Sequence, residues 1–160
     1  MKILCILLLS MFLMQPPHKL QTNKFEIVLP AESSYRIQTV DAGIANLELH
    51  LYILEQGSSY YIVSHSFYPT SIDLSNTSNF FKGVVNGMVA NYQGNLIFEK
   101  PLNVGGAIGK KVRVQLPDGD VVEVNYYLKG RTLYQVLIKS SLQEIQSNQV
   151  QDCFSSFVLY

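Results

Sequence analysis

Charged residues are scarce in this sequence, since they make up only 15% of the chain, against ~25% in a typical globular protein. Twelve Lys and Arg balance twelve Asp and Glu, so no overall field draws the chain to nucleic acid or anionic lipid. Two cysteines are too few for a disulfide-rich scaffold. The 48% hydrophobic content excludes intrinsic disorder, and the length of 160 residues suits one domain.

The N-terminal segment predicts export. Residues 3–14 form an apolar run broken only by Ser10, with Lys2 before it and two prolines after it. A secretory signal has an apolar core of ~7–15 residues, whereas a membrane-spanning helix needs ~20. We therefore expect residues 1–17 to be a signal peptide, and residues 18–160 to form a single globular domain. No triplet of small residues marks a cleavage site, so an uncleaved N-terminal anchor is the alternative, with a buried core helix as the third reading.

The two cysteines have different predicted fates. Cys5 lies inside the apolar run and is lost if the leader is cleaved, which leaves Cys153 without an intramolecular partner. Cys153 stands beside Phe154 in an apolar context, so we interpret it as a small hydrophobic residue of the core. A free reactive thiol is the alternative.

Period-two alternation of apolar residues predicts that most of the domain is β-structure. Short turns join several strands; Asp118-Gly119 and Gly130 mark two of them. Strands are expected at residues 24–29, 35–39, 46–53, 60–67, 95–99, 110–116, 121–128 and 132–139.

Two segments change to helical periodicity. Residues 73–92 carry apolar side chains at i, i+4 and i+8, which predicts an amphipathic helix facing a core. Its candidate N-caps are Asp73, Ser75, Thr77 and Ser78, and Gly94 is placed to end it. We expect Gly83 and Gly87 to allow a close approach to a sheet. Residues 147–157 predict a second, short helix, so the fold class is a single α+β domain with an antiparallel sheet.

The three histidines offer no recognisable metal motif. His18 follows the leader, while His50 and His65 lie on two strands of one expected hairpin. An approach of His50 to His65 is compatible with that hairpin, but the register is left open. Because no HxH, HxxxH or Cys/His cluster is present, we assign no metal ligand.

Other candidate chemistry also has a simpler interpretation. Ser64 and Ser66 should face away from His65 on the same strand, and no Gly-x-Ser-x-Gly motif is present. Residues 105–111 are rich in glycine and lysine but lack the spacing of a phosphate loop. We interpret the turn carboxylates of Asp118 and Asp120 as solvated. The basic residues Lys110, Lys111 and Arg113 are too few to indicate nucleic-acid binding. The glycosylation sequon at Asn76 matters only in a eukaryotic secretory pathway.

The order of elements resembles a known family. The segments that carry the likeness are residues 25–30 (FEIVLP), 61–63 leading to Tyr68-Pro69, the long helix, Gly109 with its strand, Gly130-Arg131 with residues 133–136, and residues 154–159. Together they resemble small exported bacterial proteins of uncharacterised function whose fold is like that of PsbP, a subunit of photosystem II. That family closes on Phe-x-x-Ser-Phe-x-Leu, and residues 154–159 are a variant of it, with Phe154, Ser156 and Phe157 in the matching places. The likeness spans most of residues 24–160.

The resemblance implies an α/β/α sandwich, with an antiparallel sheet of about six to eight strands and helices packed on it. Members with known roles act as accessory or assembly subunits, so we expect an exported, periplasmic or secreted, non-enzymatic accessory or binding protein. Its expected partner is an envelope protein or a small ligand, with no nucleic acid, and with the membrane involved only through an uncleaved leader. No catalytic, cofactor-binding or metal-ligating residue is assigned. The alternative is a hydrolase-like envelope enzyme whose site is assembled from distant residues, with His50 and His65 the first to test.

Overall fold

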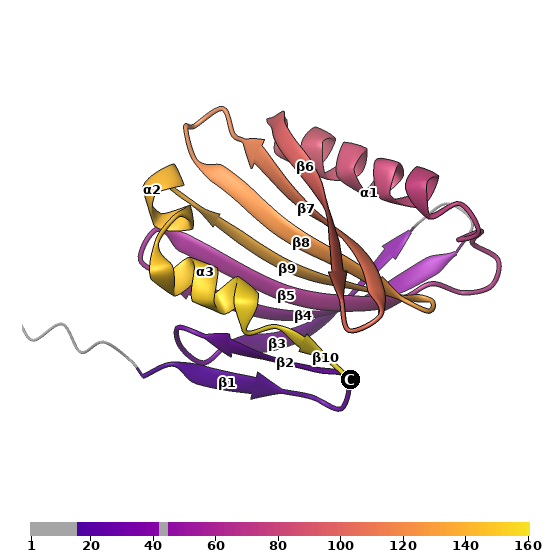
Figure 1. Ribbon diagram of the computed structural model, residues 1–160, viewed down its shortest axis with the longest axis horizontal. Coiled ribbons are helices and arrows are strands. Elements are labelled where there is room, and N and C mark those ends of the chain that lie inside the picture. The colour runs from indigo at the N-terminus through magenta and orange to yellow at the C-terminus, as the bar shows by residue number, and fades with distance from the viewer. Residues whose placement is uncertain (1–15, 42–44) are drawn as a thin grey trace, which may run out of the picture.

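The computed structural model describes residues 16–41 and 45–160, so all but the last two residues of the expected leader, residues 1–17, lie outside the described residues. The architecture is built on a seven-stranded antiparallel sheet with strand order β3-β4-β5-β9-β8-β7-β6 (Figure 1). Its strands are β3 (Ser34–Asp41), β4 (Asn46–Gln56), β5 (Ser59–Phe67), β6 (Asn95–Val104), β7 (Ala107–Gln115), β8 (Val121–Lys129) and β9 (Thr132–Ser140).

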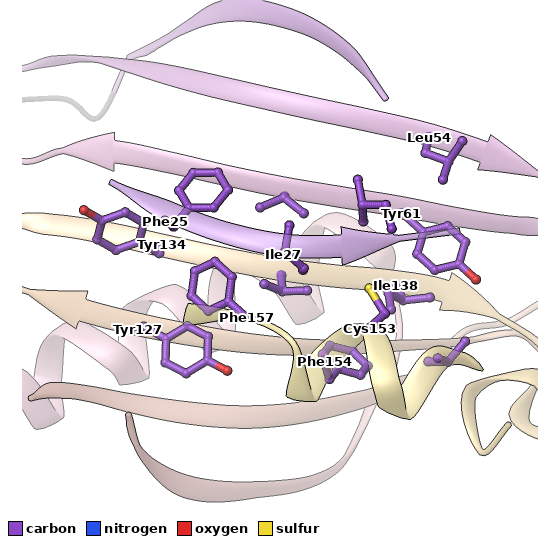
Figure 2. Close-up of a cluster of buried hydrophobic side chains, with 14 of the residues drawn as sticks. Phe25, Ile27, Leu54, Tyr61, Tyr127, Tyr134, Ile138, Cys153, Phe154 and Phe157 are labelled. Carbon is purple, nitrogen blue, oxygen red and sulfur yellow. The ribbon is translucent and has the colours of Figure 1, made fainter. Parts of the chain in front are cut away.

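One face of the large sheet is covered by a smaller sheet and two short helices (Figure 1). The small sheet has the order β1-β2-β10, with β1 (His18–Gln21), β2 (Phe25–Leu29) and β10 (Val158–Leu159). The helices are α2 (Leu142–Ile145) and α3 (Asn148–Ser155). Figure 2 shows Phe25 and Ile27 of β2 packed with Phe154 and Phe157 against side chains of the large sheet.

The opposite face of the large sheet is covered by α1 (Thr77–Tyr92). Phe81, Val85 and Met88 are its buried residues, and they pack on alternate apolar residues of β7, β8 and β9. The large sheet therefore lies between α1 on one face and the small sheet with α2 and α3 on the other, and the predicted PsbP-like α+β arrangement with helices on both faces is confirmed. None of the helices in the described ranges is long and apolar enough to cross a membrane.

The ends of α1 differ from the prediction. The N-cap is Asn76, whose side chain accepts a hydrogen bond from the Asn79 amide at 2.9 Å. Gln93 takes the left-handed conformation after the last turn, with φ of 49°. Gly94 comes one residue later, and its lack of a side chain lets the chain pass close to Val114 and Gln115 of β7.

The expected role of Gly83 and Gly87 is wrong. Both residues are exposed, and a Cβ added at either would meet nothing within 4 Å. The apolar stripe of α1 faces the sheet without help from these glycines. They therefore carry the cost of glycine in a helix interior with no packing benefit.

All seven strands of the large sheet were predicted in their order along the chain, although several of their bounds differ from the prediction. β6 and β7 are longer than expected and meet at a tight turn, in which Gly105 and Gly106 have φ of 57° and 77°. This turn accounts for the glycine-rich segment. Periodicity did not predict β1, β10 or α2, because elements of two to four residues are too short to show a period.

Candidate functional site

His50 and His65 lie directly opposite each other on the β4–β5 hairpin. Their ring centroids are 4.5 Å apart and the ring planes differ by 10°, so the two imidazoles are stacked. The register follows from the turn, because Gln56 pairs with Ser59 around Gly57-Ser58. A two-residue hairpin turn with glycine at a positive φ is a signal that the sequence contains, and it would have fixed the pairing of the histidines.

The histidine pair is the centre of a row of rings from four neighbouring strands. Tyr35 of β3 stacks on His50 with centroids 6.1 Å apart, and Tyr134 of β9 stacks on His65 at the same separation. Phe25 of β2 meets His65 edge-on at 6.0 Å. Aromatic cross-strand contacts of this kind stabilise a sheet and fix ring orientation, so both imidazoles are held in place.

His50 is anchored by a hydrogen bond. Its Nδ1 lies 2.7 Å from the hydroxyl of Tyr35. When the tyrosine donates, the neutral imidazole carries its own proton on Nε2. When Nδ1 carries the proton instead, the imidazole donates to the tyrosine oxygen, and in both cases the contact holds the half-buried ring in place.

His65 is buried, and one of its two ring nitrogens has no hydrogen-bond partner among the described residues. The residue is 6% exposed, and its Nδ1 has no hydrogen-bond partner in the described residues. Burial, together with the charge of Lys24 and the neighbouring His50, lowers the pKa of His65 to about 4. The ring is therefore neutral near pH 7, with one buried nitrogen left without a partner.

A pocket of about 370 Å³ opens over this pair, and we name it the histidine cleft. Its residues come from the β1–β2 turn, from β3, β4 and β5, and from the segment after β5: Lys24, Thr39, Asn46, Glu48, His50, His65, Phe67 and Pro69. Phe67 is 59% exposed and presents an apolar ring beside polar groups. The sequence could not predict this grouping, because Lys24 reaches the cleft from the small sheet.

The stacked geometry limits what the two histidines can do. Ring-nitrogen lone pairs lie in the ring plane, so nearly parallel rings do not direct both toward one ion. In residues 16–41 and 45–160 no group of three or more His, Cys, Asp or Glu residues could hold a metal. Because strand side chains alternate, Ser64 and Ser66 lie on the face opposite His65. Among the described residues that line the cleft, the hydroxyl belongs to Thr39.

The remaining sequence candidates lie elsewhere. His18 begins β1 opposite Leu29 and does not line the histidine cleft. Cys153 is 3% exposed and lies in the aromatic core (Figure 2); burial raises the pKa of its thiol to about 12, which supports a packing role. Asp118 and Asp120 approach Lys139 at 3.3 and 3.6 Å.

The basic cluster on β7 has a structural partner that the sequence analysis missed. Glu123 of β8 is fully buried, and its carboxylate meets Lys111 at 2.6 Å and the Nε of Arg113 at 2.7 Å. Lys110 pairs with Glu99 of β6 at 3.0 Å. These cations therefore hold β7 to its neighbours instead of forming a free anion-binding patch.

Comparison with known proteins shows the fold. No protein-family model matches the sequence, and no curated protein matches it. Among solved structures, the solution structure of cyanobacterial PsbP (CyanoP) from Synechocystis sp. PCC 6803 is similar, with a TM-score of 0.62 and 11% sequence identity. The match covers 90% of this chain and 92% of the cyanobacterial one. The chain therefore has a PsbP-like fold, as the sequence motifs predicted.

Proposed function

We propose that this protein is an exported, non-enzymatic accessory or binding protein of the cell envelope that acts through the histidine cleft. The observation that carries the proposal is the pocket of about 370 Å³ that is lined by the stacked rings of His50 and His65. The PsbP-like fold supports an accessory role by analogy alone.

Two properties of the cleft favour binding over catalysis. A general base works best when its pKa is close to the operating pH, whereas the pKa of His65 is lowered to about 4. A nucleophile must also lie within hydrogen-bond reach of its base, and the described residues that line the cleft include no serine or cysteine. Rings held on both sides by other rings suit a preformed surface for recognition.

An envelope enzyme of the hydrolase type is the second candidate, because the hairpin does bring His50 and His65 into one pocket. In that case His50→Ala or His65→Ala would abolish turnover. The export itself rests on the apolar leader at residues 3–14. A variant of the proposal is a tethered form that keeps residues 1–17 as an anchor. The mass of the N-terminal segment distinguishes this form from a cleaved one.

The test is native mass spectrometry of the protein recovered from its own envelope fraction. We expect a processed chain that keeps a companion, either a protein or a small molecule, and we expect Phe67→Ser to lose it. Ile108→Ser is the matched control, because Ile108 is 51% exposed on β7, outside the cleft. An unprocessed chain in the cytosolic fraction would overturn export. A companion that survives Phe67→Ser, or turnover that His50→Ala abolishes, would overturn the binding proposal.

A further inference from the structure

We propose that the histidine cleft binds a small zwitterion, a molecule of the amino acid or short-peptide class that carries both an ammonium and a carboxylate. This inference rests on the proposed binding function and names its ligand. The structural reason is that the cleft places one positive and one negative side chain, Lys24 and Glu48, around the same pocket.

Neither charge of the cleft is used by the fold. Within the part of the chain that the structure describes, no ion pair or hydrogen bond joins the side chain of Lys24 or Glu48 to another residue. Lys19 and Glu26, on the neighbouring strands of the small sheet, do pair with each other at 2.7 Å. The ammonium of Lys24 and the carboxylate of Glu48 are therefore both available to a ligand.

The charge balance of the cleft selects the class of ligand. With His65 neutral, the lining carries one cation and one anion. A simple anion would gain from Lys24 and be repelled by Glu48, and a simple cation would meet the reverse. A molecule with both charges satisfies both side chains, and electrostatic complementarity of this kind decides specificity.

The size and chemistry of the remaining wall fit such a molecule. A volume of about 370 Å³ is near the lower end of the ~300–1,000 Å³ range of ligand pockets. Phe67 and Pro69 offer apolar contact to a hydrocarbon side chain, and Thr39 and Asn46 offer hydrogen bonds.

The experiment is an NMR titration of the full chain that follows its imidazole ring protons. The chain has three histidines, and His18 lies outside the cleft, so its signal is an internal control. The probes are L-leucine and L-leucyl-L-leucine, which carry both charges at different separations. N-acetyl-L-leucine lacks the ammonium, and L-leucinamide lacks the carboxylate.

We expect one or both zwitterions to shift the His50 and His65 signals saturably while the His18 signal stays still. Each single-charge probe should bind at least about tenfold more weakly, the ratio that ~1.4 kcal/mol gives. Lys24→Met should remove the preference for leucine over leucinamide, because the carboxylate then has no cation to meet. Glu48→Gln should remove the preference for leucine over its N-acetyl derivative.

Lys82→Met and Glu55→Gln are the matched control variants, since Lys82 lies on α1 and Glu55 at the far end of β4; both should keep the full pattern. Equal binding of all four probes, or no saturable shift up to about 10 mM, tenfold above a ~1 mM Kd, would overturn the zwitterion assignment. If the companion found by mass spectrometry still depends on Phe67 in that case, the binding function stands and only its ligand class is wrong.

Discussion

Replacement of Gly83 and Gly87 by alanine should stabilise the protein. Both glycines lie inside α1 on its exposed side, and a Cβ at either position meets no atom within 4 Å. Alanine is favoured over glycine in a helix interior by about 0.8–1 kcal/mol. The double variant should therefore gain about 1.5–2 kcal/mol, which raises Tm by roughly 3–8 °C in a domain of this size.

Urea unfolding followed by circular dichroism measures the gain as a shift in the midpoint at constant slope. Gly94→Ala is the contrasting variant, because its Cβ would lie 2.7 Å from the backbone oxygen of Gln115 and should destabilise the protein. If the double variant at positions 83 and 87 is neutral or less stable, then this side of α1 packs against something, and its assignment as solvent-facing is wrong.

Three further predictions concern buried groups. The pKa of His65 is about 4 in the folded chain against an ordinary value of 6.5, so the unfolded chain binds the proton more readily; stability should fall as the pH is lowered from about 6.5 to 4, and urea titrations of His65→Phe should lose part of that fall. Cys153, 3% exposed, should react with a thiol reagent near pH 8 only as fast as the protein unfolds, and rapid labelling of the native protein would contradict its packing role. Glu123→Gln leaves Lys111 and Arg113 without a counter-charge and should cost about 2–4 kcal/mol by calorimetry, less than a fully buried pair because both cations are partly exposed; an unchanged Tm would show that the ion pairs contribute nothing.

The fold could be predicted from the sequence where an element is long enough to show its period. The strands of the large sheet and α1 met that condition, and β8 was predicted although it contains Glu123. The buried position of Glu123 could not be inferred, because its two cations lie on a different strand. Short elements such as β10 depend on pairing with distant residues, which leaves no local signal.

Part of the candidate site could likewise be predicted from the sequence, and part could not. His50 and His65 were singled out, and the hairpin turn contains enough information to pair them, because one tight turn sets the register of the strands that it joins. Lys24 was not associated with them, since it reaches the cleft through the packing of the small sheet on the large one. A site assembled from two sheets is a tertiary property, and periodicity along one strand does not encode it.

The small sheet brings together strands from opposite ends of the described chain. Its middle strand, β2, pairs with β10 through Phe25 and Leu159, and the Tyr160 amide donates to the carbonyl oxygen of Lys24 at 3.0 Å. β2 and β10 are separated in the sequence by the whole large sheet and α1, so their pairing joins segments that are far apart along the chain. Lys24 lines the histidine cleft, and the hydrogen bond from Tyr160 therefore ties one wall of the cleft to the C-terminal strand. The shape of that wall depends on a backbone contact across almost the full described length of the chain.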